Sequence, residues 1–598
     1  MRQPAVQVHP TDRAGARPHH RAADAAEVAA AALLSAVVAC LAWSQLGWLL
    51  SWHFSGAQSL CVGGTALLAV MAVAFRRLGP QATFQAGVTA AICALVSLGL
   101  ASIVKDYSYD GQRYHQQAVL ALAGGWNPLR DEPLQGANSL WINGYAKGPW
   151  TWSAAWLDAT GNIEMGKSLH VWLSASAGLL AYGALLRLPA LGRAAAWWIA
   201  VLAAANPVLL YQWPTHMNDS LVGSLLLALA SQSARLALSP SGGSRAAYGW
   251  LAAALALALL PTVKSSGMAY GLLVCVAAWA VALVARRLDL LRAVTLLAAA
   301  SLLPAALLLG WNPYVTNTLR HGHPFYPLAG AANVDIITGN SPAGLQEAGR
   351  VGQWLGSLFS ESHSELGDSN QPAFRPKWPG VVTGQELARF SSKTDMRIGG
   401  FGPWFSLGLV LAMVAAAAAA ARATSRAMFC AAALAVAILA LTLAFPEPWW
   451  ARYVPQMYLL PLVLVAAVLA IAGRGVWTRK LAVSALVVLS LNALAVAGTF
   501  AAGAAVRELD LRTQVASLAA LSSADRPLAV SLGEEPSLGL RLSASAVHWR
   551  LAGERETCGQ WVTLHQSGVR ICLPPGSAAK YQHESPAVLH IKSFLRRQ

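Results

Sequence analysis

Long apolar runs recur along the whole chain, and they limit its fold more than any other feature. Many of them reach or approach the ~20 residues that a helix needs to cross a bilayer. Only 12% of the 598 residues are charged, whereas 56% are hydrophobic. A water-soluble chain of this length would need far more charge to cover its surface. We therefore predict an all-α polytopic membrane protein with about 13 transmembrane helices. The predicted spans are residues 28–50, 57–75, 83–104, 166–186, 194–212, 218–235, 247–263, 266–285, 293–311, 401–421, 427–445, 453–473 and 481–502.

Basic residues gather in the short turns on one side of these spans, where Asp289 is the only acid. They are Arg76, Arg77, Arg187, Arg193, Arg235, Arg245, Arg286, Arg287, Arg292, Arg422, Arg426, Arg474, Arg479 and Lys480. Such an excess marks the cytoplasmic side of a membrane protein. The formal net charge of +16 is therefore mainly a topology signal, and it requires no nucleic acid as a partner. We expect a multi-pass protein of the bacterial inner (cytoplasmic) membrane, with a cytoplasmic N-terminus and a periplasmic C-terminus.

Three longer segments fall on the opposite, periplasmic side. Two are loops, at about 105–165 and 312–400, and the third is the tail, 503–598. The tail combines a helical stretch near 505–522 with strand-like runs, "RPLAVSLG" and "AVLHIKSF", which indicates a small C-terminal α/β periplasmic domain. Residues 27–502 form the predicted transmembrane domain. Residues 1–26 are polar, and we expect them to be a disordered cytoplasmic tail.

Two cysteines of the tail flank an apparent hairpin. Cys558 and Cys572 stand 14 residues apart in "ETCGQWVTLHQSGVRICLPP". They fall on the side of the membrane where oxidation is permitted, so a disulfide between them is predicted. The alternative is a pair of unrelated free thiols.

Two aspartates stand where the third predicted span leaves the membrane. Asp106 precedes, and Asp110 lies within, the segment "SYDGQRYHQQAVLALAGGWNPL" (108–129). A carboxylate there is close to the bilayer yet reachable from water. Partial burial can tune its pKa, which suits a general base. The alternative for both residues is a helix N-cap or a solvated loop acid.

Several basic side chains fall near the membrane surface on the non-cytoplasmic side, where such residues are scarce. They are Lys264, Arg320, His321, His323 and Arg452. Ionisable groups at the edge of a helix bundle are candidates for function, and guanidinium groups bind phosphate through paired donors. We therefore expect these residues to bind a lipid-linked phosphate. Salt bridges or contacts with lipid head groups are the alternative.

A divalent metal ion is a further possibility, although no cofactor is predicted with certainty. Carboxylates and imidazoles could together bind such an ion. The chain shows no HxxxH motif and no tight cluster of such ligands, so no metal site is predicted. The residues considered are Asp106, Asp110, His115, His216 and Asp219.

Six segments, in this order, resemble motifs of the GT-C glycosyltransferases. They are "DGQRYH" (110–115) followed by "GGWNPL", "NPVLLYQWPTHMNDSL" (206–221), "PTVKSSG" (261–267), "WNPYVTNTLRHGHPFYPL" (311–328), "RIGGFGPWF" (397–405) and "PWWARYVPQMYLLP" (448–461). GT-C enzymes are polytopic and use polyprenyl-phosphate sugars. They include protein O-mannosyltransferases, lipid A aminoarabinose transferases and mycobacterial arabinosyltransferases. The resemblance covers about residues 83–475. Many members carry an Asp-Glu pair in the first motif, whereas Gly111 follows Asp110 here, which leaves the role of the second acid open.

The resemblance implies an inverting transferase that moves a sugar from a polyprenyl-phosphate-linked donor to an envelope glycan, lipid or protein acceptor at the periplasmic face. Asp110 would be the catalytic base, and Asp219 would share that role or orient the acceptor. Lys264, Arg320 and Arg452, with His321 and His323, would bind the donor phosphate. We expect further substrate contacts from Asp106, Tyr114, His115, Asn218 and Tyr326. Membrane lipids are the remaining expected partners.

Two other functions fit a polytopic chain with large loops. A lipid-linked oligosaccharide flippase or secondary transporter predicts polar groups at mid-membrane and broken helices in matching halves. An O-antigen ligase or polymerase would use an Arg/His loop without the early aspartate. A requirement for Asp110 in turnover would distinguish the transferase from both.

Overall fold

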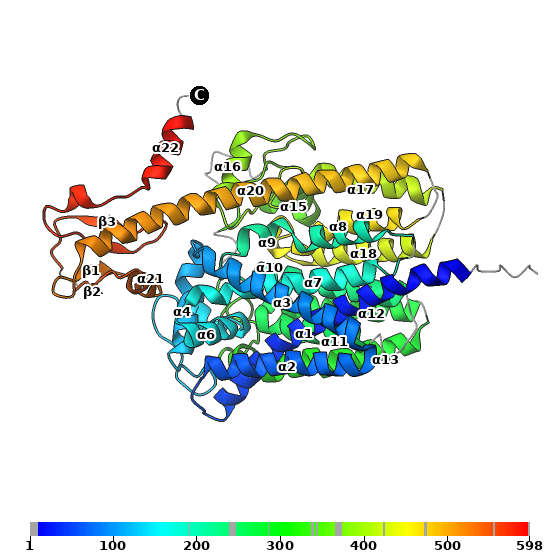
Figure 1. Cartoon of the computed structure of the whole chain (residues 1–598), viewed down its shortest axis with the longest axis horizontal. Helices are drawn as coiled ribbons and strands as arrows, with labels where there is room; N and C mark the ends of the chain where they lie inside the picture. The colour runs from blue at the N-terminus through cyan, green and yellow to red at the C-terminus, as the bar shows by residue number, and fades with distance from the viewer. Residues whose placement is uncertain are drawn as a thin grey trace, which may run out of the picture.

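The computed structural model describes residues 10–595, apart from 189, 239–246, 285, 336–339, 343–344, 365–373, 423–424, 472–474 and 554–555. It is mostly helical, with a small sheet near the C-terminus (Figure 1). The helices run roughly side by side along the long axis of the molecule. The sheet lies at one end, and the N-terminal end of α1, in dark blue, points towards the other.

Nine helices of the described residues are long and apolar enough to cross a membrane. They are α1 (Pro10–Leu49), α2 (Gly56–Leu78), α3 (Pro80–Ile103), α7 (Ser168–Leu185) extended by η2 (Ile163–Lys167), α10 (Asp219–Leu238), α12 (Ser265–Val284), α13 (Leu288–Pro304) with η4 (Ala305–Leu309), α18 (Arg426–Ala444) and α20 (Val476–Leu521). Four shorter apolar helices lie among them: α8 (Arg193–Ala204), α11 (Ala247–Val263), α17 (Phe405–Ala420) and α19 (Leu459–Leu469). Every predicted span overlaps one of these helices. The count of 13 is not confirmed, because four of the helices are short.

Burial separates the central helix from those at the lipid-facing surface. In α1, Ala29–Ala32 are fully buried, and small side chains allow neighbouring helices to approach closely. A Cβ added to Gly63 of α2 would lie 2.7 Å from the Ala36 carbonyl oxygen of α1. By contrast, Phe84 and Leu95 of α3 remain 73% and 70% exposed. Apolar surface of that extent on a helix is typical of contact with lipid.

The N-terminal end of α1 corrects one prediction. The helix begins at Pro10, so residues 10–26 are helical rather than disordered; residues 1–9 lie outside the described residues. Buried Glu27 of this helix forms ion pairs with Arg187, at 2.9 Å, and Arg235, at 2.9 Å. Within the predicted tail itself, Asp24 also pairs with Arg187, at 3.0 Å. Of the basic residues named for the turns, Arg245 and Arg474 lie outside the described residues.

Short helices fill the two large loops. The first loop contains η1 (Gly111–His115), α4 (Gln116–Ala123), α5 (Ser139–Gly144) and α6 (Gly148–Thr160). The second contains η5 (Trp311–Val315), α14 (Thr316–His321), η7 (Leu345–Ala348), α15 (Gly349–Leu358) and α16 (Gly384–Ser392). Elsewhere, α9 (Pro207–Gln212) precedes α10, and η8 (Ala451–Tyr453) and η9 (Pro455–Tyr458) lead into α19.

The C-terminal domain is built on the end of α20, which continues from the membrane region without a break. Its strands are β1 (Leu528–Ser531), β2 (Trp549–Leu551), β3 (Trp561–Thr563) and β4 (Arg570–Cys572), in the order β2-β1-β4-β3. The parallel pair β1 and β2 is connected through α21 (Leu538–Ala544), and the other pairs are antiparallel. Cys558 and Cys572 form the predicted disulfide.

One strand prediction in this domain is wrong. The run "RPLAVSLG" does contain β1, but "AVLHIKSF" lies in helix α22 (Pro586–Leu595), which follows η10 (Ala578–Lys580). Pro586 stands at the start of α22, where a proline is favoured because the first helical N–H groups need no intrahelical partner. A short apolar run cannot by itself distinguish strand from helix.

Candidate active site

Three carboxylates from distant parts of the chain surround the guanidinium of Arg452. Asp110 begins η1, Asp219 begins α10, and Asp395 lies between α16 and α17. Their oxygens are 3.4 Å, 3.9 Å and 3.5 Å from Arg452 nitrogens. Arg452 lies in η8, which is followed by η9 and then α19. The two large loops and the late helices therefore meet at this arginine.

Two further cations balance the carboxylates. Lys264 Nζ is 2.5 Å from one oxygen of Asp219, and Gln212 donates to the other at 3.3 Å. Arg397 Nε is 3.4 Å from Asp395. Three carboxylates and three cationic side chains thus form one cluster, which we call the Asp110 site. Its members are Asp110, Asp219, Asp395, Lys264, Arg397 and Arg452.

Aromatic rings fix the cations in place. The Arg452 guanidinium carbon lies 4.7 Å from the Trp450 ring centroid and 5.0 Å from that of Tyr453. Lys264 Nζ lies 4.6 Å from the Tyr453 ring, and the indole N–H of Trp450 donates to Asp395 at 2.9 Å. Cation–π contacts of this kind stabilise a desolvated charge by about 2 kcal/mol. The cluster is therefore pre-organised.

Asp110 is the most exposed carboxylate of the cluster. Its side chain is 27% exposed, whereas that of Asp219 is 5% exposed. Burial raises the pKa of Asp110, and Asp395 and Asp219 raise it further, although Arg452 opposes the change. A carboxylate that reaches solvent and has a raised pKa can accept a proton from a hydroxyl group more readily than an ordinary aspartate.

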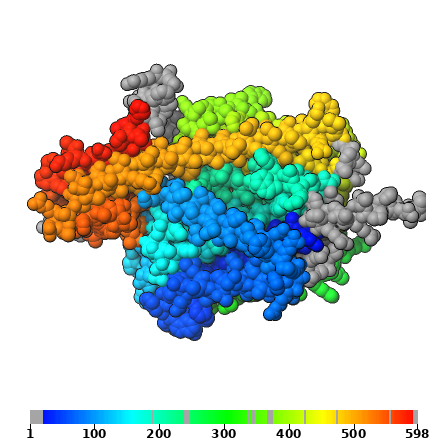
Figure 2. Space-filling view, in the orientation of Figure 1, coloured from blue at the N-terminus to red at the C-terminus, as the bar shows by residue number. Residues whose placement is uncertain are grey.

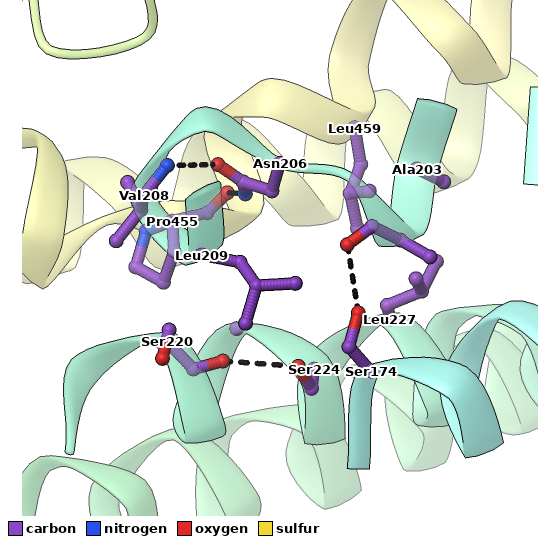
Figure 3. A pocket seen from close by; sticks show the side chains of 12 residues that line it. Ser174, Ala203, Asn206, Val208, Leu209, Ser220, Ser224, Leu227, Pro455 and Leu459 are labelled. Carbon is purple, nitrogen blue, oxygen red and sulfur yellow. Dashed lines mark hydrogen bonds between the residues drawn. The ribbon is translucent and has the colours of Figure 1, made fainter. Parts of the chain in front are cut away.

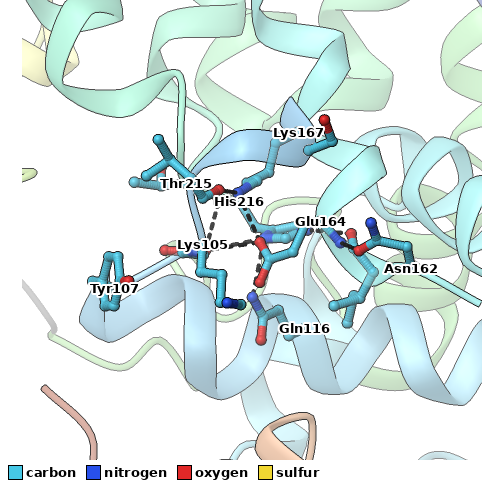
Figure 4. Close-up of polar contacts among 12 residues, drawn as sticks. Lys105, Tyr107, Gln116, Asn162, Glu164, Lys167, Thr215 and His216 are labelled. Carbon is cyan, nitrogen blue, oxygen red and sulfur yellow. Dashed lines mark hydrogen bonds and ion pairs between the residues drawn. The ribbon is translucent and has the colours of Figure 1, made fainter. Parts of the chain in front are cut away.

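Asp106, only four residues earlier, has a different environment. Figure 4 shows the neighbouring side chains of Glu164, Lys167 and His216. It is fully buried. One of its oxygens accepts hydrogen bonds from the backbone N–H of His216, at 2.8 Å, and from His216 Nδ1, at 3.0 Å. The other accepts from the N–H and hydroxyl of Ser108, both at 2.7 Å. Burial opposes ionisation, but the His216 hydrogen bond and charge hold the pKa of Asp106 below its ordinary value. This geometry supports a positioning role rather than the predicted contact with substrate.

Charged side chains complete the surroundings of Asp106. Glu164 pairs with Lys167 at 2.7 Å and with Arg541 of α21 at 3.0 Å. Arg541 also donates to the Asp106 carbonyl at 3.1 Å. We call this group, with His216, the Asp106 cluster. Through it, the C-terminal domain directly contacts the segment that carries Asp110.

Gly111 is explained by the same packing. A Cβ at this position would lie 2.0 Å from Asp106 Oδ2 and 2.3 Å from Ser108 Oγ. No side chain fits there unless the loop moves. The absence of the second acid of the Asp-Glu pair therefore follows from how closely η1 packs on Asp106.

Three predicted substrate-contact residues lie beside Asp110 or Asp219. The ring of Tyr114 is 4.2 Å from that of His115 and 5.9 Å from that of Tyr145. His115 is buried and accepts a hydrogen bond from the Trp150 indole at 2.7 Å, and burial lowers its pKa to about 3, so the ring is neutral. Asn218 is 8% exposed, and its buried Oδ1 has no hydrogen-bond partner among the described residues.

The remaining predicted phosphate ligands lie apart from the Asp110 site. Arg320 and His321 end α14 and are exposed, and the His321 ring stacks on Tyr326 at 3.7 Å. His323 accepts a hydrogen bond from the Phe325 N–H at 3.1 Å. None of the described carboxylates pairs with Arg320, His321 or His323. We call these residues, with Tyr326, the α14 group.

Hydrogen bonds connect the segment before the α14 group to backbone near Tyr145 and Lys264. Asn317 Nδ2 donates to the Gly144 carbonyl at 3.1 Å, directly before Tyr145. The Tyr314 hydroxyl donates to the Pro261 carbonyl at 2.6 Å, in the turn that leads to Lys264. Leu308, Trp311 and Leu319 nearby in the chain are 61%, 42% and 76% exposed. The segment that carries the α14 group thus contacts both large-loop and bundle backbone, and it also carries exposed apolar side chains.

The considered metal ligands do not gather at one point. Asp106 pairs with His216, whereas Asp110 and Asp219 surround Arg452. Within the described part of the chain, no group of three or more His, Cys, Asp or Glu side chains is arranged to bind a metal ion.

A small polar pocket lies behind the site and connects the segments that carry two of its residues (Figure 3). Asn206 Nδ2 donates to the Pro455 carbonyl at 2.8 Å, three residues after Arg452. Ser220, next to Asp219, has its hydroxyl 2.7 Å from His170 Nδ1. The first contact joins η9 to the residue before α9, and the second joins the start of α10 to α7.

Two charged residues of the site were not predicted from the sequence. Asp395 and Arg397 stand in "TDMRIGG", where an acid and an arginine precede the return to the membrane. Trp450 and Tyr453 belong to the quoted motif "PWWARYVPQMYLLP" but were not named as site residues. The signal that could have identified Asp395 is an acid two residues before Arg397, on the same side as Asp110.

Comparisons with known proteins find similarity among solved structures, including two of ArnT. No family model matches the chain, and no curated protein does. The crystal structure of ArnT from Cupriavidus metallidurans bound to undecaprenyl phosphate is similar, with 14% identity and a TM-score of 0.43 over 79% of this chain and 86% of that chain. Its apo structure gives 14% identity and a TM-score of 0.42 over 86% and 91% of the two chains. The proposal below rests on the residues of this chain.

Proposed function

We propose that this protein is an inverting membrane glycosyltransferase of the GT-C type. It moves a sugar from a polyprenyl-phosphate-linked donor to an envelope glycan, lipid or protein acceptor at the periplasmic face. The observation that supports this most strongly is the Asp110 site. Its three carboxylates converge on Arg452, and Asp110, the most exposed of them, has a raised pKa.

Asp110 acts as the general base. It takes the proton of an acceptor hydroxyl as the hydroxyl oxygen attacks the anomeric carbon of the donor sugar. The bond from that carbon to the phosphate oxygen breaks at the same time, and the polyprenyl phosphate leaves. A single displacement inverts the configuration at the anomeric carbon. General-base catalysis of this kind contributes about 10²–10⁴ to the rate.

The α14 group binds the leaving phosphate. Lys264 and Arg452 already neutralise carboxylates, whereas Arg320, His321 and His323 pair with no described acid. Guanidinium and imidazole donors stabilise the charge that develops on the phosphate in the transition state. The exposed side chains of Leu308, Trp311 and Leu319 offer a surface for the polyprenyl chain. In this proposal Lys264 and Arg452 position Asp219 and Asp110, and they do not bind the phosphate.

The distribution of charge favours transfer over transport. A transporter would place its ionisable groups at mid-membrane. Here Asp110, Asp395 and Arg452 lie outside the membrane-spanning helices, where the loops meet the bundle. A ligase that works through an Arg/His loop alone would not need the cluster around Arg452.

The test compares wild-type protein with Asp110→Asn in a strain that lacks the gene. Mass spectrometry of the envelope glycans, lipids and proteins should show one sugar missing in the deletion strain. Wild-type protein should restore this sugar, and Asp110→Asn, present in the membrane at equal amount, should not. An unchanged glycan profile in the deletion strain would refute the proposed transferase.

A further inference from the structure

A second polar cleft of about 430 Å³ lies where α20, α16 and the C-terminal domain meet. A volume of this size is within the range of small-ligand sites. Figure 2 shows the C-terminal domain, in orange and red, at the end of the molecule beside the first loop. The polar side chains that line the cleft are Ser391, Ser392, Arg507, Asp510, His565, Gln566, His583 and Glu584.

Arg507 is the residue of the cleft that most needs a partner. It is only 5% exposed, and its buried Nε has no hydrogen-bond partner among the described residues. Its Nη1 donates to the Ser391 carbonyl at 2.5 Å. No described carboxylate forms an ion pair with it. A buried guanidinium without a counter-charge is costly, and an anion that enters the cleft offsets that cost.

The other cleft residues add donors, whereas the acids are engaged within the chain. His565 Nε2 is buried without a partner among the described residues, and Ser392 lies at the exposed edge, where its hydroxyl donates to the Arg389 carbonyl at 3.3 Å. Asp510 accepts from the Ser585 N–H at 2.8 Å. Glu584 also has an interaction within the chain. The donors that remain are suited to an oxyanion.

Two contacts and one short stretch of chain link the cleft to the segments that carry Asp110 and Asp395. The Arg507 guanidinium carbon is 5.7 Å from the ring of Tyr107, three residues before Asp110. Gln112, two residues after Asp110, donates to the carbonyl of cleft residue Gln566 at 2.9 Å. Ser391 precedes Asp395 by only four residues, which an extended chain spans in at most ~14 Å.

We propose that this cleft binds the phosphate or carboxylate group of the acceptor, with Arg507 and His565 as its principal donors. The binding of an oxyanion follows from the cleft alone. Its assignment to the acceptor rests on the proposed function, because an acceptor held there presents its hydroxyl towards Asp110 while the donor occupies the α14 side. The C-terminal domain would thus select the acceptor.

Hydrogen–deuterium exchange of the full-length protein in detergent tests oxyanion binding without any need for turnover. The probes are inorganic phosphate, glucuronate and uncharged glucose, each at millimolar concentrations. Phosphate, glucuronate or both should slow exchange in peptides covering 505–513 and 563–568, and glucose should not. Protection by only one of the two anions identifies the group that the cleft accepts. No protection by either, or equal protection by glucose, would overturn the proposal.

Variants locate the binding. Arg507→Gln should weaken the effect of the protective anion about 10-fold or more, because a hydrogen bond to a charged group contributes about 1.5–3 kcal/mol. Because Arg507 is buried, Ser392→Trp provides a second test that fills the cleft from its exposed edge. The matched control is Ala388→Trp, one turn earlier on the same helix and outside the cleft. Binding that survives Ser392→Trp but not Ala388→Trp would place the anion elsewhere.

Kinetics then test the assignment to the acceptor. In a transfer assay, Ser392→Trp should raise KM for the acceptor at least several-fold and leave KM for the polyprenyl donor unchanged. If the cleft binds an anion but the KM for the acceptor does not rise, the cleft is an anion site that does not bind the acceptor. Absence of transfer by the wild-type protein would reject the proposed function and leave the exchange result standing.

Discussion

Asp106 and Asp110 stand four residues apart in one loop, yet their surroundings differ in almost every respect. Asp106 is fully buried, and hydrogen bonds from Ser108 and His216 engage both of its oxygens. Asp110 is 27% exposed, and a single weak contact of 3.4 Å joins it to Arg452. The pKa of Asp106 is lowered, because His216 outweighs burial, whereas burial and two neighbouring carboxylates raise the pKa of Asp110. Partners, rather than burial alone, decide which carboxylate retains the capacity to accept a proton.

The difference indicates a division of labour. The Asp106 cluster joins the first loop, the start of α7 and the C-terminal domain through buried hydrogen bonds and ion pairs. The Asp110 site holds opposite charges at looser distances, where a substrate can exchange with them. A rigid frame beneath a more accessible cluster is the arrangement that a pre-organised site requires.

The largest effect should come from Asp110→Asn. The substitution keeps the shape of the side chain and removes the proton acceptor, so kcat should fall about 10²–10⁴-fold. Initial rates of sugar transfer by purified protein in proteoliposomes measure this loss. Thermal unfolding in detergent should be unchanged, because Asp110 contributes little to packing. Transfer within threefold of wild type would remove Asp110 from catalysis and direct attention to Asp219 and Asp395.

Next to Asp106, by contrast, Gly111→Ala should lower the stability of the protein. The new Cβ would lie 2.0 Å from Asp106 Oδ2, and overpacking of this kind costs about 1–3 kcal/mol. Thermal unfolding and the amount of protein in the membrane should both fall. Gly99→Ala in α3 is the matched control, because no heavy atom lies within 4 Å of its added Cβ. Equal stability of the two variants would refute the tight packing of η1 on Asp106.

The helices and several charged residues of the site could be predicted from the sequence, because they depend on local chemistry. Apolar runs located the helices, because the bilayer imposes a local requirement on each of them. Asp110, Asp219, Lys264 and Arg452 could be grouped because each stands where a predicted span meets the side predicted to be non-cytoplasmic. The burial of Asp106 could not be predicted, since its partner His216 is 110 residues away. Asp395 was missed for the same reason, because only long-range packing brings it to Arg452.

The predicted phosphate ligands show that ion pairing cannot be predicted from sequence position alone. Five basic residues on one side of the membrane formed a single group in the sequence, but the structure divides them. Lys264 and Arg452 pair with carboxylates, whereas Arg320, His321 and His323 do not pair with any described acid. Charge and membrane side can be read from a sequence, but pairing depends on the three-dimensional arrangement.

Arg541→Gln should sharpen the comparison, because Arg541 connects the C-terminal domain to the Asp106 cluster. It donates to the Asp106 carbonyl at 3.1 Å and to Glu164 at 3.0 Å. Loss of one such charged hydrogen bond should lower kcat about 10-fold through misplacement of the loop. The donor KM should stay within twofold, and Arg541→Lys should recover part of the rate. Arg550→Gln, which removes an exposed ion pair of the same domain, is the control with little expected effect.

The smallest effect concerns pH. Transfer requires ionised Asp110, so activity falls as pH decreases through its pKa, which lies above the ordinary aspartate value. Asp395 is one of the neighbouring charges that raise this pKa. Asp395→Asn removes that charge and also frees Arg452 to pair more closely with Asp110. Both changes lower the pKa of Asp110, so the acidic limb of kcat/KM should move to lower pH by about 0.5–1 unit, equivalent to about 0.7–1.4 kcal/mol.

Asp525→Asn makes the same charge change at an exposed position of the C-terminal domain and should leave the profile in place. An acidic limb that does not move in Asp395→Asn, or moves to higher pH, would mean that Asp110 is not the group whose ionisation limits transfer.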